Sequence, residues 1–389
     1  MAVHYFIWRF TRPLMSRFRS QSMPGWPTRP LTLRTCLWLI LVGLTLPACS
    51  RAQPPQPADD IIDTIDARLN LQPFPKNFQW GLVGYHIAFP SYRLHPDDID
   101  RMAKAGVEWL NIDFTWRDIE PMPGQFTFDY YDMIVQEAQR HGLHILGRIG
   151  NGFAAYRPTT PDWAQHLDDQ NYNVALQKYA EATVSRYKDH IEQYALENEA
   201  NLAEGQAQRG QRRTGTWTQE RVVSVWKVLS DTIRRLDPKD LIVLSLSDAP
   251  ALQPWLDAAA AGGVSYDRIG FQSYVCGFIP AQQCRAALLP KITSAIRLSG
   301  KDVVMLETGF CPSSDLYSPE KQADYVETMV KSLRHMPVKG VFFYEYLESP
   351  DEPTEGGRHC GFVQNDRTPK PAWERLQAMI ARYKETSPP

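Results

Sequence analysis

Three short apolar runs follow one another in the second half of the chain: Leu241-Ile-Val-Leu-Ser245, Ile269-Gly-Phe-Gln-Ser273 and Val303-Val-Met-Leu306. A stretch with helical periodicity fills each gap, at residues 253–261 and 286–299. Short strands that alternate with helices are the sequence sign of strand–helix–strand units, which build parallel sheets. This segment therefore predicts an α/β fold.

The same alternation extends outward from this segment to residue 78 and to residue 384. Eight strands are expected, at residues 79–85, 108–114, 145–148, 193–198, 241–245, 269–273, 303–306 and 340–344. A helix is expected after each, at residues 96–105, 130–141, 173–188, 219–236, 253–261, 286–299, 319–335 and 372–384. Eight such units in about 310 residues predict a single (β/α)8 TIM barrel. A doubly wound open sheet is the alternative, but Gly147, Gly150 and Gly152 lack the spacing of a phosphate-binding loop.

Several helix ends carry their own signals. Gly106, Gly142, Gly262 and Gly300 come just after expected helices, where a left-handed residue closes the last turn. Ser318-Pro-Glu320 suits a helix start, because Ser caps free amides, Pro fits the first turn and Glu complements the helix dipole.

Two glutamates stand where apolar runs stop. Glu199 ends Tyr194-Ala-Leu-Glu-Asn-Glu199, and Glu307 follows Val303-Val-Met-Leu306. In a barrel these are the carboxyl ends of strands four and seven, which meet at the rim where chemistry is done. Hydrolysis of a glycosidic bond requires two carboxyls that face one gap, one as acid and one against the anomeric carbon. The pair therefore predicts a glycosidase.

The motifs around these glutamates resemble those of clan A glycoside hydrolases, which are retaining (β/α)8 enzymes. Asn198-Glu199 resembles the Asn-Glu pair that ends the fourth strand of that clan, and Val304-Met-Leu-Glu307-Thr-Gly309 resembles its strand-seven segment. Tyr274 resembles the strand-six tyrosine. The resemblance extends over most of residues 78–385 and is nearest to family thirty-nine and its β-galactosidase or cellulase-like relatives.

The resemblance implies a role for each of these residues. Glu199 would be the acid/base and Glu307 the nucleophile that forms a covalent glycosyl-enzyme on a β-linked carbohydrate. Asn198 would hold the sugar 2-hydroxyl, and Tyr274 would hydrogen-bond the nucleophile. No cofactor is implied. The sequence also lacks the CxxC and HExxH patterns of metal sites, so no metal is expected.

Three positions depart from the clan's pattern. Asn111 stands where we align the strand-two arginine, Gln272 replaces the strand-six histidine of many relatives, and Phe343-Tyr344 replaces the strand-eight tryptophan. Loss of a cation and an indole keeps an alternative open, a carbohydrate-binding barrel lipoprotein without turnover. A transglycosylase, which shares the covalent intermediate, is a second alternative.

Other polar and aromatic residues have weaker signals. Glu197 lies two residues from Glu199, so strand alternation places both on one face. We expect Glu197 to pair with a nearby Arg or Lys, and the alternative is that Glu197 is itself the acid. Trp116 and Glu120 are expected to pin the loop after strand two.

Four aromatic residues are candidates for sugar stacking, because the C–H faces of a sugar ring suit an aromatic surface. They are Tyr85, Trp163, Trp217 and Tyr344, and packing in the core is the alternative for each. We retain Tyr85, Trp163 and Tyr344 as substrate-binding candidates.

The N-terminus predicts export. Arg34 precedes the apolar run Leu37–Leu46, which is short for a membrane span, and Leu46-Pro-Ala-Cys49 resembles a lipobox. We expect residues 1–49 to form a lipoprotein signal with Cys49 lipidated, residues 50–76 a Pro-rich tether and lead-in, and residues 77–389 the catalytic barrel. The protein would then be periplasmic or on the surface of a bacterial cell, anchored by lipid. An ordinary cleaved signal and an uncleaved anchor stay open.

Export to an oxidising compartment favours disulfides. Four cysteines follow the signal, Cys276, Cys284, Cys311 and Cys360, and they allow three pairings that sequence alone cannot separate. We prefer Cys276–Cys284 within one loop and Cys311–Cys360 between two loops, with free buried thiols as the alternative.

Composition restricts the partners. The chain has 389 residues, 43% of them hydrophobic, enough for a large core and incompatible with a disordered chain. Residues 50–389 carry 36 basic and 44 acidic side chains, whereas binding to nucleic acid depends on clustered Lys and Arg. We expect a monomer that binds an oligo- or polysaccharide, does not bind nucleic acid, and meets a membrane only through its N-terminal anchor.

Overall fold

The computed structural model describes residues 74–85, 93–150, 159–202, 217–248, 251–311, 318–351 and 356–385. They belong to one compact unit, Gln72–Pro389. The expected export signal, Cys49 and most of the tether lie outside the described residues. Among the helices that are described, none has the length and apolarity that a membrane span requires.

The eight strands form one closed barrel in sequence order, and every neighbouring pair is parallel. They are β1 (Gln79–Tyr85), β2 (Trp109–Thr115), β3 (His144–Gly150), β4 (Gln193–Leu196), β5 (Leu241–Ser247), β6 (Arg268–Gln272), β7 (Asp302–Thr308) and β8 (Val338–Phe343). The predicted TIM barrel is therefore confirmed.

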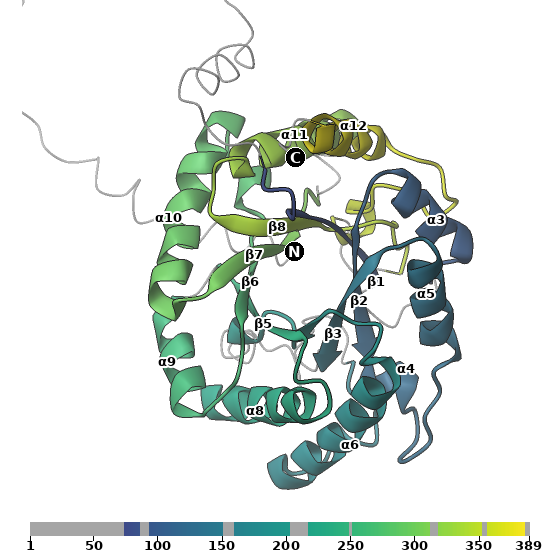
Figure 1. The fold of residues 1–389 in the computed structure, drawn as a ribbon, viewed down its shortest axis with the longest axis vertical. Helices are drawn as coiled ribbons and strands as arrows, with labels where there is room; N and C mark the ends of the chain where they lie inside the picture. Colours follow the sequence, from purple (N-terminus) through teal and green to yellow (C-terminus); the bar gives the residue numbers. More distant parts are fainter. Residues whose placement is uncertain are drawn as a thin grey trace, which may run out of the picture. The chain divides into compact units, whose positions relative to one another are not determined.

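Helices surround the barrel, as Figure 1 shows. They are α3 (Pro96–Lys104), α4 (Trp116–Ile119), α5 (Asp129–Arg140), α6 (Asp169–Tyr187), α8 (Gln219–Leu236), α9 (Gln253–Ala261), α10 (Ala281–Ser299), α11 (Pro319–Leu333) and α12 (Pro371–Glu385). Short 3-10 turns follow β4 (η2, Ala200–Leu202), β6 (η3, Val275–Gly277) and β8 (η4, Gly357–His359).

Strand alternation divides the core into two apolar clusters. Side chains that point into the barrel form a small cluster: Val83, Leu146, Ala195, Val243, Val304, Leu306 and Phe342. The outward side chains pack with the helices in a much larger cluster. Because both faces of every strand are buried, the strands read as continuous apolar runs, and this is why their positions could be found from sequence.

Local sequence signals determine where several helices begin. Ser318 caps α11 by accepting a hydrogen bond from the Lys321 amide, as predicted. The helix expected at 173 begins at Asp169, because the Asp168 side chain accepts from the Asn171 amide and adds a turn. The helix expected at 286 begins at Ala281.

The glycine prediction needs one correction. Gly106, Gly142 and Gly300 have positive φ angles, as expected at left-handed helix ends. Gly262 has φ −77°, so the prediction for it was wrong, and the following Gly263 takes the left-handed conformation with φ 66°. With two glycines in succession, either could supply the positive φ that closes the helix.

Candidate active site

Glu307 reaches the barrel interior because β7 bulges. Phe271 of β6 pairs with Met305 and the next residue, Gln272, pairs with Glu307, so β7 carries one extra residue here. Without the bulge, alternation from the inward Leu306 would turn Glu307 outward. A bulge that re-aims a side chain is common beside active sites. Glu307 consequently points inward while being 3% exposed.

Two side chains hold the Glu307 carboxylate. The Arg148 guanidinium of β3 donates to Oε1 at 2.8 Å, and the Tyr274 hydroxyl donates to Oε2 at 3.0 Å. Burial and the charge of Glu307 raise the pKa of Tyr274 well above its ordinary value, so the phenol stays protonated and remains a donor. Each oxygen of the Glu307 carboxylate is thus bound by one donor.

Sequence reasoning missed Arg148. It is fully buried and also donates to Asp113 of β2 at 3.0 Å. Burial alone would lower the pKa of Arg148, but Asp113 and Glu307 raise it above its ordinary value. The expected loss of a cation was therefore wrong: Asn111 carries no charge, but β3 supplies the guanidinium.

A signal for this cation was present in the sequence. Arg148 interrupts the apolar run Ile145-Leu-Gly-Arg-Ile149, and a buried strand tolerates such a charge only with a partner. Asp113 holds the neighbouring position on β2, where strand register pairs the two residues.

Glu199 lies across the interior from these residues, in the turn after β4. Burial and the negative charge of Glu307 raise its pKa to about 8, and a hydrogen bond with the Ser247 side chain and the charge of Arg148 partly oppose this shift. Glu199 is therefore mostly protonated at neutral pH. The two glutamates meet in one site, where the charge of Glu307 acts on the carboxyl of Glu199.

Asn198 is oriented by the residue at a departing position. The Gln272 side-chain amide donates to Asn198 Oδ1 at 2.6 Å and to Ser245 Oγ at 2.7 Å. Gln272 is fully buried. The structure thus brings Asn198, Glu199, Tyr274 and Glu307 to one end of the barrel.

The prediction that Glu197 and Glu199 share one face of a strand was wrong. β4 ends at Leu196, and both Glu197 (φ 55°) and Glu199 (φ 48°) are left-handed, so the strand period does not continue through them. The Glu197 carboxylate is fully buried against Gly150, where a Cβ would overlap it. Glu197 also contributes to the raised pKa of Tyr179. The Glu197 side chain therefore lies among the outward side chains that pack between the strands and the helices.

Tyr344, the residue after β8, lies at the site. Phe342 belongs to the inner cluster, Phe343 packs outward against Phe362, and Tyr344 turns inward again. The half-buried Tyr344 ring meets the edge of Tyr274 at 6.0 Å between centroids. Tyr344 thus adjoins Tyr274, which is a hydrogen-bond partner of Glu307.

Trp163 and Trp217 are held in packing arrangements. Trp163 donates from its indole to the Glu120 carbonyl at 3.1 Å and meets Trp116 edge-on. Trp217 is 6% exposed and lies under the Arg221 guanidinium at 4.0 Å. The Tyr85 side chain lies outside the described residues.

The loop after β2 is fixed as predicted. Trp116 donates to the Glu120 carboxylate at 2.7 Å, and the Gly124 amide donates to its other oxygen at 2.7 Å. Both Trp116 and Glu120 are buried, so they serve this loop as structural residues.

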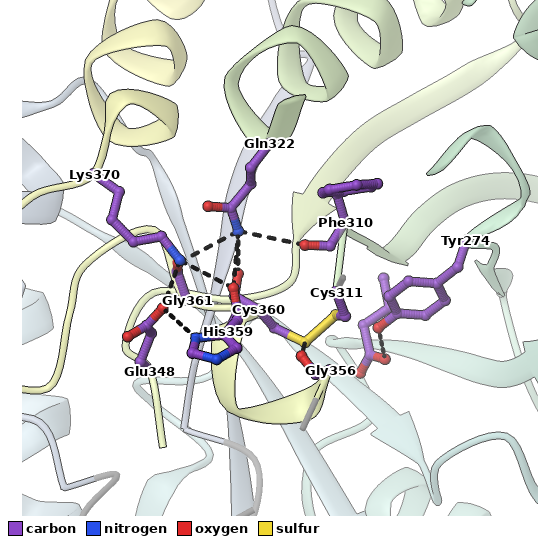
Figure 2. The surroundings of a disulfide bond; sticks show 11 residues. Tyr274, Phe310, Cys311, Gln322, Glu348, Gly356, His359, Cys360, Gly361 and Lys370 are labelled. Carbon is purple, nitrogen blue, oxygen red and sulfur yellow. Dashed lines mark hydrogen bonds and ion pairs between the residues drawn. A yellow bond between two sulfur atoms is a disulfide. The ribbon is translucent and has the colours of Figure 1, made fainter. Parts of the chain in front are cut away.

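Both preferred disulfides are present. Cys276–Cys284 lies two residues after Tyr274, and Cys311–Cys360 joins the loops after β7 and β8. Figure 2 shows the second bond beside Tyr274, with Gln322 of α11 donating to the Cys360 carbonyl at 2.7 Å. Lys370 donates to Glu348 at 2.6 Å in the same surroundings. The chain that follows Glu307 is therefore joined covalently to the loop after β8, and α11 holds that loop by a hydrogen bond.

A family model supports the motif-based resemblance in part of the chain. The model Glyco_hydro_42, described as Beta-galactosidase, matches residues 90–170. This segment contains β2 and β3, with Asp113 and Arg148, but neither glutamate.

Solved structures match over most of the barrel. A variant of GH5_18 from Streptomyces cattleya, solved in complex with Manβ1-4GlcNAc, has a TM-score of 0.65 at 16% identity and covers 79% of this chain and 82% of that one. The exo-β-1,4-mannosidase Op5Man5 from Opitutaceae bacterium strain TAV5 has a TM-score of 0.60 at 16% identity, covering 75% of this chain and 56% of its own. A family 39 glycoside hydrolase from Bacteroides cellulosilyticus WH2 has a TM-score of 0.56 at 18% identity, covering 79% and 64%.

The chain resembles clan A glycoside hydrolases. The likeness to family thirty-nine is no more specific than the likeness to other families of the clan. The chain spans little more than half of the mannosidase's length.

Proposed function

We infer that the protein is a retaining glycoside hydrolase that cleaves a β-linked carbohydrate through a covalent glycosyl-enzyme. The observation that carries this inference is the opposite treatment of two carboxyls in one site. Arg148 and Tyr274 each donate to one oxygen of Glu307 and fix that carboxylate in place, whereas burial and Glu307 raise the pKa of Glu199 to about 8 and favour its acid form.

In the first step, a Glu307 oxygen attacks the anomeric carbon as the bond from that carbon to the leaving oxygen breaks. Glu199 donates its proton to the leaving oxygen, so the aglycone departs as a neutral alcohol. Asn198, oriented by Gln272, binds the sugar 2-hydroxyl, an interaction that strengthens in the transition state.

In the second step, water attacks the same carbon and the ester bond to Glu307 breaks. Glu199 now accepts the proton of the water. The reversal of its role follows from charge: once Glu307 is esterified it is neutral, so the pKa of Glu199 falls. Two displacements return the original configuration, and they require carboxyls about 5–5.5 Å apart.

The class of sugar is proposed from the solved neighbours and from the aromatic residues of the site. Solved neighbours include a mannosidase, a glycosidase bound to Manβ1-4GlcNAc and a xylanase, and the matching family model is a β-galactosidase. We propose a neutral hexoside or pentoside, with Tyr344 beside the ring and Tyr85 and Trp163 as further contacts.

The test is proton NMR of hydrolysis with β-mannosides, β-galactosides, β-glucosides and β-xylosides. We expect at least one to yield the β-anomer first, with mutarotation following. Glu307→Gln should abolish this turnover. An α-anomer as first product, or turnover that survives in Glu307→Gln, would rule out the mechanism.

We propose separately that the barrel is exported and anchored as a monomer through a lipid on Cys49. The apolar run before Cys49 and the cysteine usage support this proposal. Expression of the full chain in a Gram-negative host should place the protein in the membrane fraction, and Cys49→Ala should release it or leave an unprocessed precursor. A soluble, processed protein without lipid would contradict it.

A further inference from the structure

The backbone of Glu199 is in a conformation that a glutamate rarely adopts. Its φ angle is 48°, in the left-handed region, three residues after β4 ends. For a residue with a Cβ this conformation is strained, so the surroundings must hold it.

Asn201, two residues later, attaches this turn to β5. Its side-chain amide donates to the Ser247 carbonyl at 2.9 Å, and its side-chain oxygen accepts from the Ser247 amide at 2.9 Å. Asn201 is 3% exposed and Ser247 is 5% exposed. A buried side-chain amide that bonds both the N–H and the C=O of one residue fixes both distance and orientation.

The attachment also reaches Glu199. The Leu202 amide donates to the Glu199 carbonyl at 2.8 Å, and the Ser247 side chain acts on the Glu199 carboxyl, whose pKa it lowers. Asn201 thus joins the turn that carries Glu199 to the strand residue that influences its carboxyl.

We propose that Asn201 is a positioning residue that holds the Glu199 carboxyl at the leaving oxygen. This proposal rests on the proposed function. It means that Asn201 affects only the proton transfers made by Glu199. The side-chain bonds of Asn201 go to Ser247, whereas Glu307 is held by Arg148 and Tyr274. Loss of the Asn201 amide therefore moves the acid and leaves the nucleophile in place.

This separation has a kinetic signature. A phenyl leaving group needs a proton from Glu199, whereas 2,4-dinitrophenolate leaves without one. Asn201→Ala should lower kcat/KM about 10²-fold for the phenyl β-glycoside, a typical contribution of acid catalysis. For the 2,4-dinitrophenyl glycoside, kcat/KM should change less than about threefold, while kcat and KM fall together because water attack lacks its base.

Azide supplies a second readout, since it attacks the intermediate without a base. It should raise kcat of Asn201→Ala on the dinitrophenyl glycoside and form a glycosyl azide. Asn173→Ala is the matched control, because Asn173 also makes a part-buried side-chain bond, 2.6 Å to Ser224, but does so between α6 and α8. It should leave both substrates unaffected.

Equal loss on both glycosides, or no loss on either, would overturn the role of Asn201. Wild-type turnover of the dinitrophenyl glycoside in the same assay shows that the proposed function stands. If wild type turns over no glycoside of the panel, the proposed function fails, and a crystal structure of Asn201→Ala decides the positioning role by itself. A Glu199 carboxyl that has moved from Ser247 supports the role, and an unmoved one refutes it.

Discussion

Arg148 neutralises two buried carboxylates at once, Asp113 and Glu307, and it has almost no contact with solvent. A charge in such a place is tolerated because its partners are charged as well. The guanidinium therefore connects β2 and β3 to the Glu307 carboxylate of β7.

Arg148→Met should lower the free energy of unfolding by about 3–5 kcal/mol, because it leaves two uncompensated buried carboxylates. It should also lower kcat/KM by more than about 10²-fold, because the Glu307 anion loses its charged donor. Urea denaturation and steady-state kinetics measure the two effects.

The double variant Arg148→Met/Asp113→Asn separates the effect on stability from the effect on activity. Removing the second carboxylate should restore much of the stability, while activity stays low. Recovery of activity in the double variant would show that Arg148 acts on the fold alone.

The raised pKa of Glu199 predicts the pH dependence of the reaction. Glu199 must be protonated to act as acid, so kcat/KM should fall as pH rises through about 8. In the 2-fluoroglycosyl enzyme, where Glu307 is neutral, Glu199 should titrate at lower pH. The profile of kcat/KM and carboxyl NMR of the trapped enzyme measure the two values. An alkaline limit near the ordinary value of a glutamate would contradict the assignment.

At this scale the sequence placed Glu199 and Glu307 at the ends of apolar runs, and the resemblance placed Tyr274 beside Glu307; the structure brings the three residues to one end of the barrel. It did not predict Arg148, because a cation within a strand has meaning only when the register to Asp113 is known. Asn201 was missed because its partner is the backbone of Ser247, which has no sequence signal.

Among elements, β7 has the most demanding local geometry. Its bulge turns Glu307 inward, and two residues later Gly309 passes so close to the residue after β8 that a Cβ would overlap the Tyr344 carbonyl oxygen. The glycine of the Glu-Thr-Gly sequence is thus a structural requirement of this close approach.

Gly309→Ala should destabilise the protein by about 1–3 kcal/mol, as overpacking usually does. It should also lower kcat/KM by at least about tenfold, because displacement near the nucleophile misplaces it. Gly300→Ala is the control: it has open space but a positive φ, so it should cost stability without changing kcat/KM. Similar kinetics for both variants would remove the special role of Gly309.

Element ends were less predictable than element identity. β4 was expected to reach Asn198 but ends at Leu196, because the chain turns left-handed at Glu197 to present Glu199. No glycine stands at either left-handed position, so propensity could not reveal the turn. The site itself overrides the local preference.

In the molecule as a whole, the two disulfides should contribute unequally. Cys311–Cys360 closes a separation of 49 residues and Cys276–Cys284 one of 8, so loop entropy predicts about 4 kcal/mol for the first and about 2.5 kcal/mol for the second. Urea denaturation of the two double Cys→Ser variants checks the order. A greater loss from Cys276–Cys284 would show that local contacts outweigh loop entropy.

The closed barrel could be predicted because all eight strands are buried on both faces and each is followed by a helix. The contacts between distant segments of the chain could be predicted only in part. The disulfide pairing was one of three possibilities, and the meeting of β3 with β7 through Arg148 and Glu307 depends on closure of the barrel.

The most direct test of the central claim is mass spectrometry of the protein after incubation with 2-deoxy-2-fluoro β-glycosides of the four sugars. The account predicts a mass increase of one fluorosugar and, after proteolysis, a label on Glu307. A label on any other residue would contradict it, and so would turnover of the parent glycoside with no trapped intermediate.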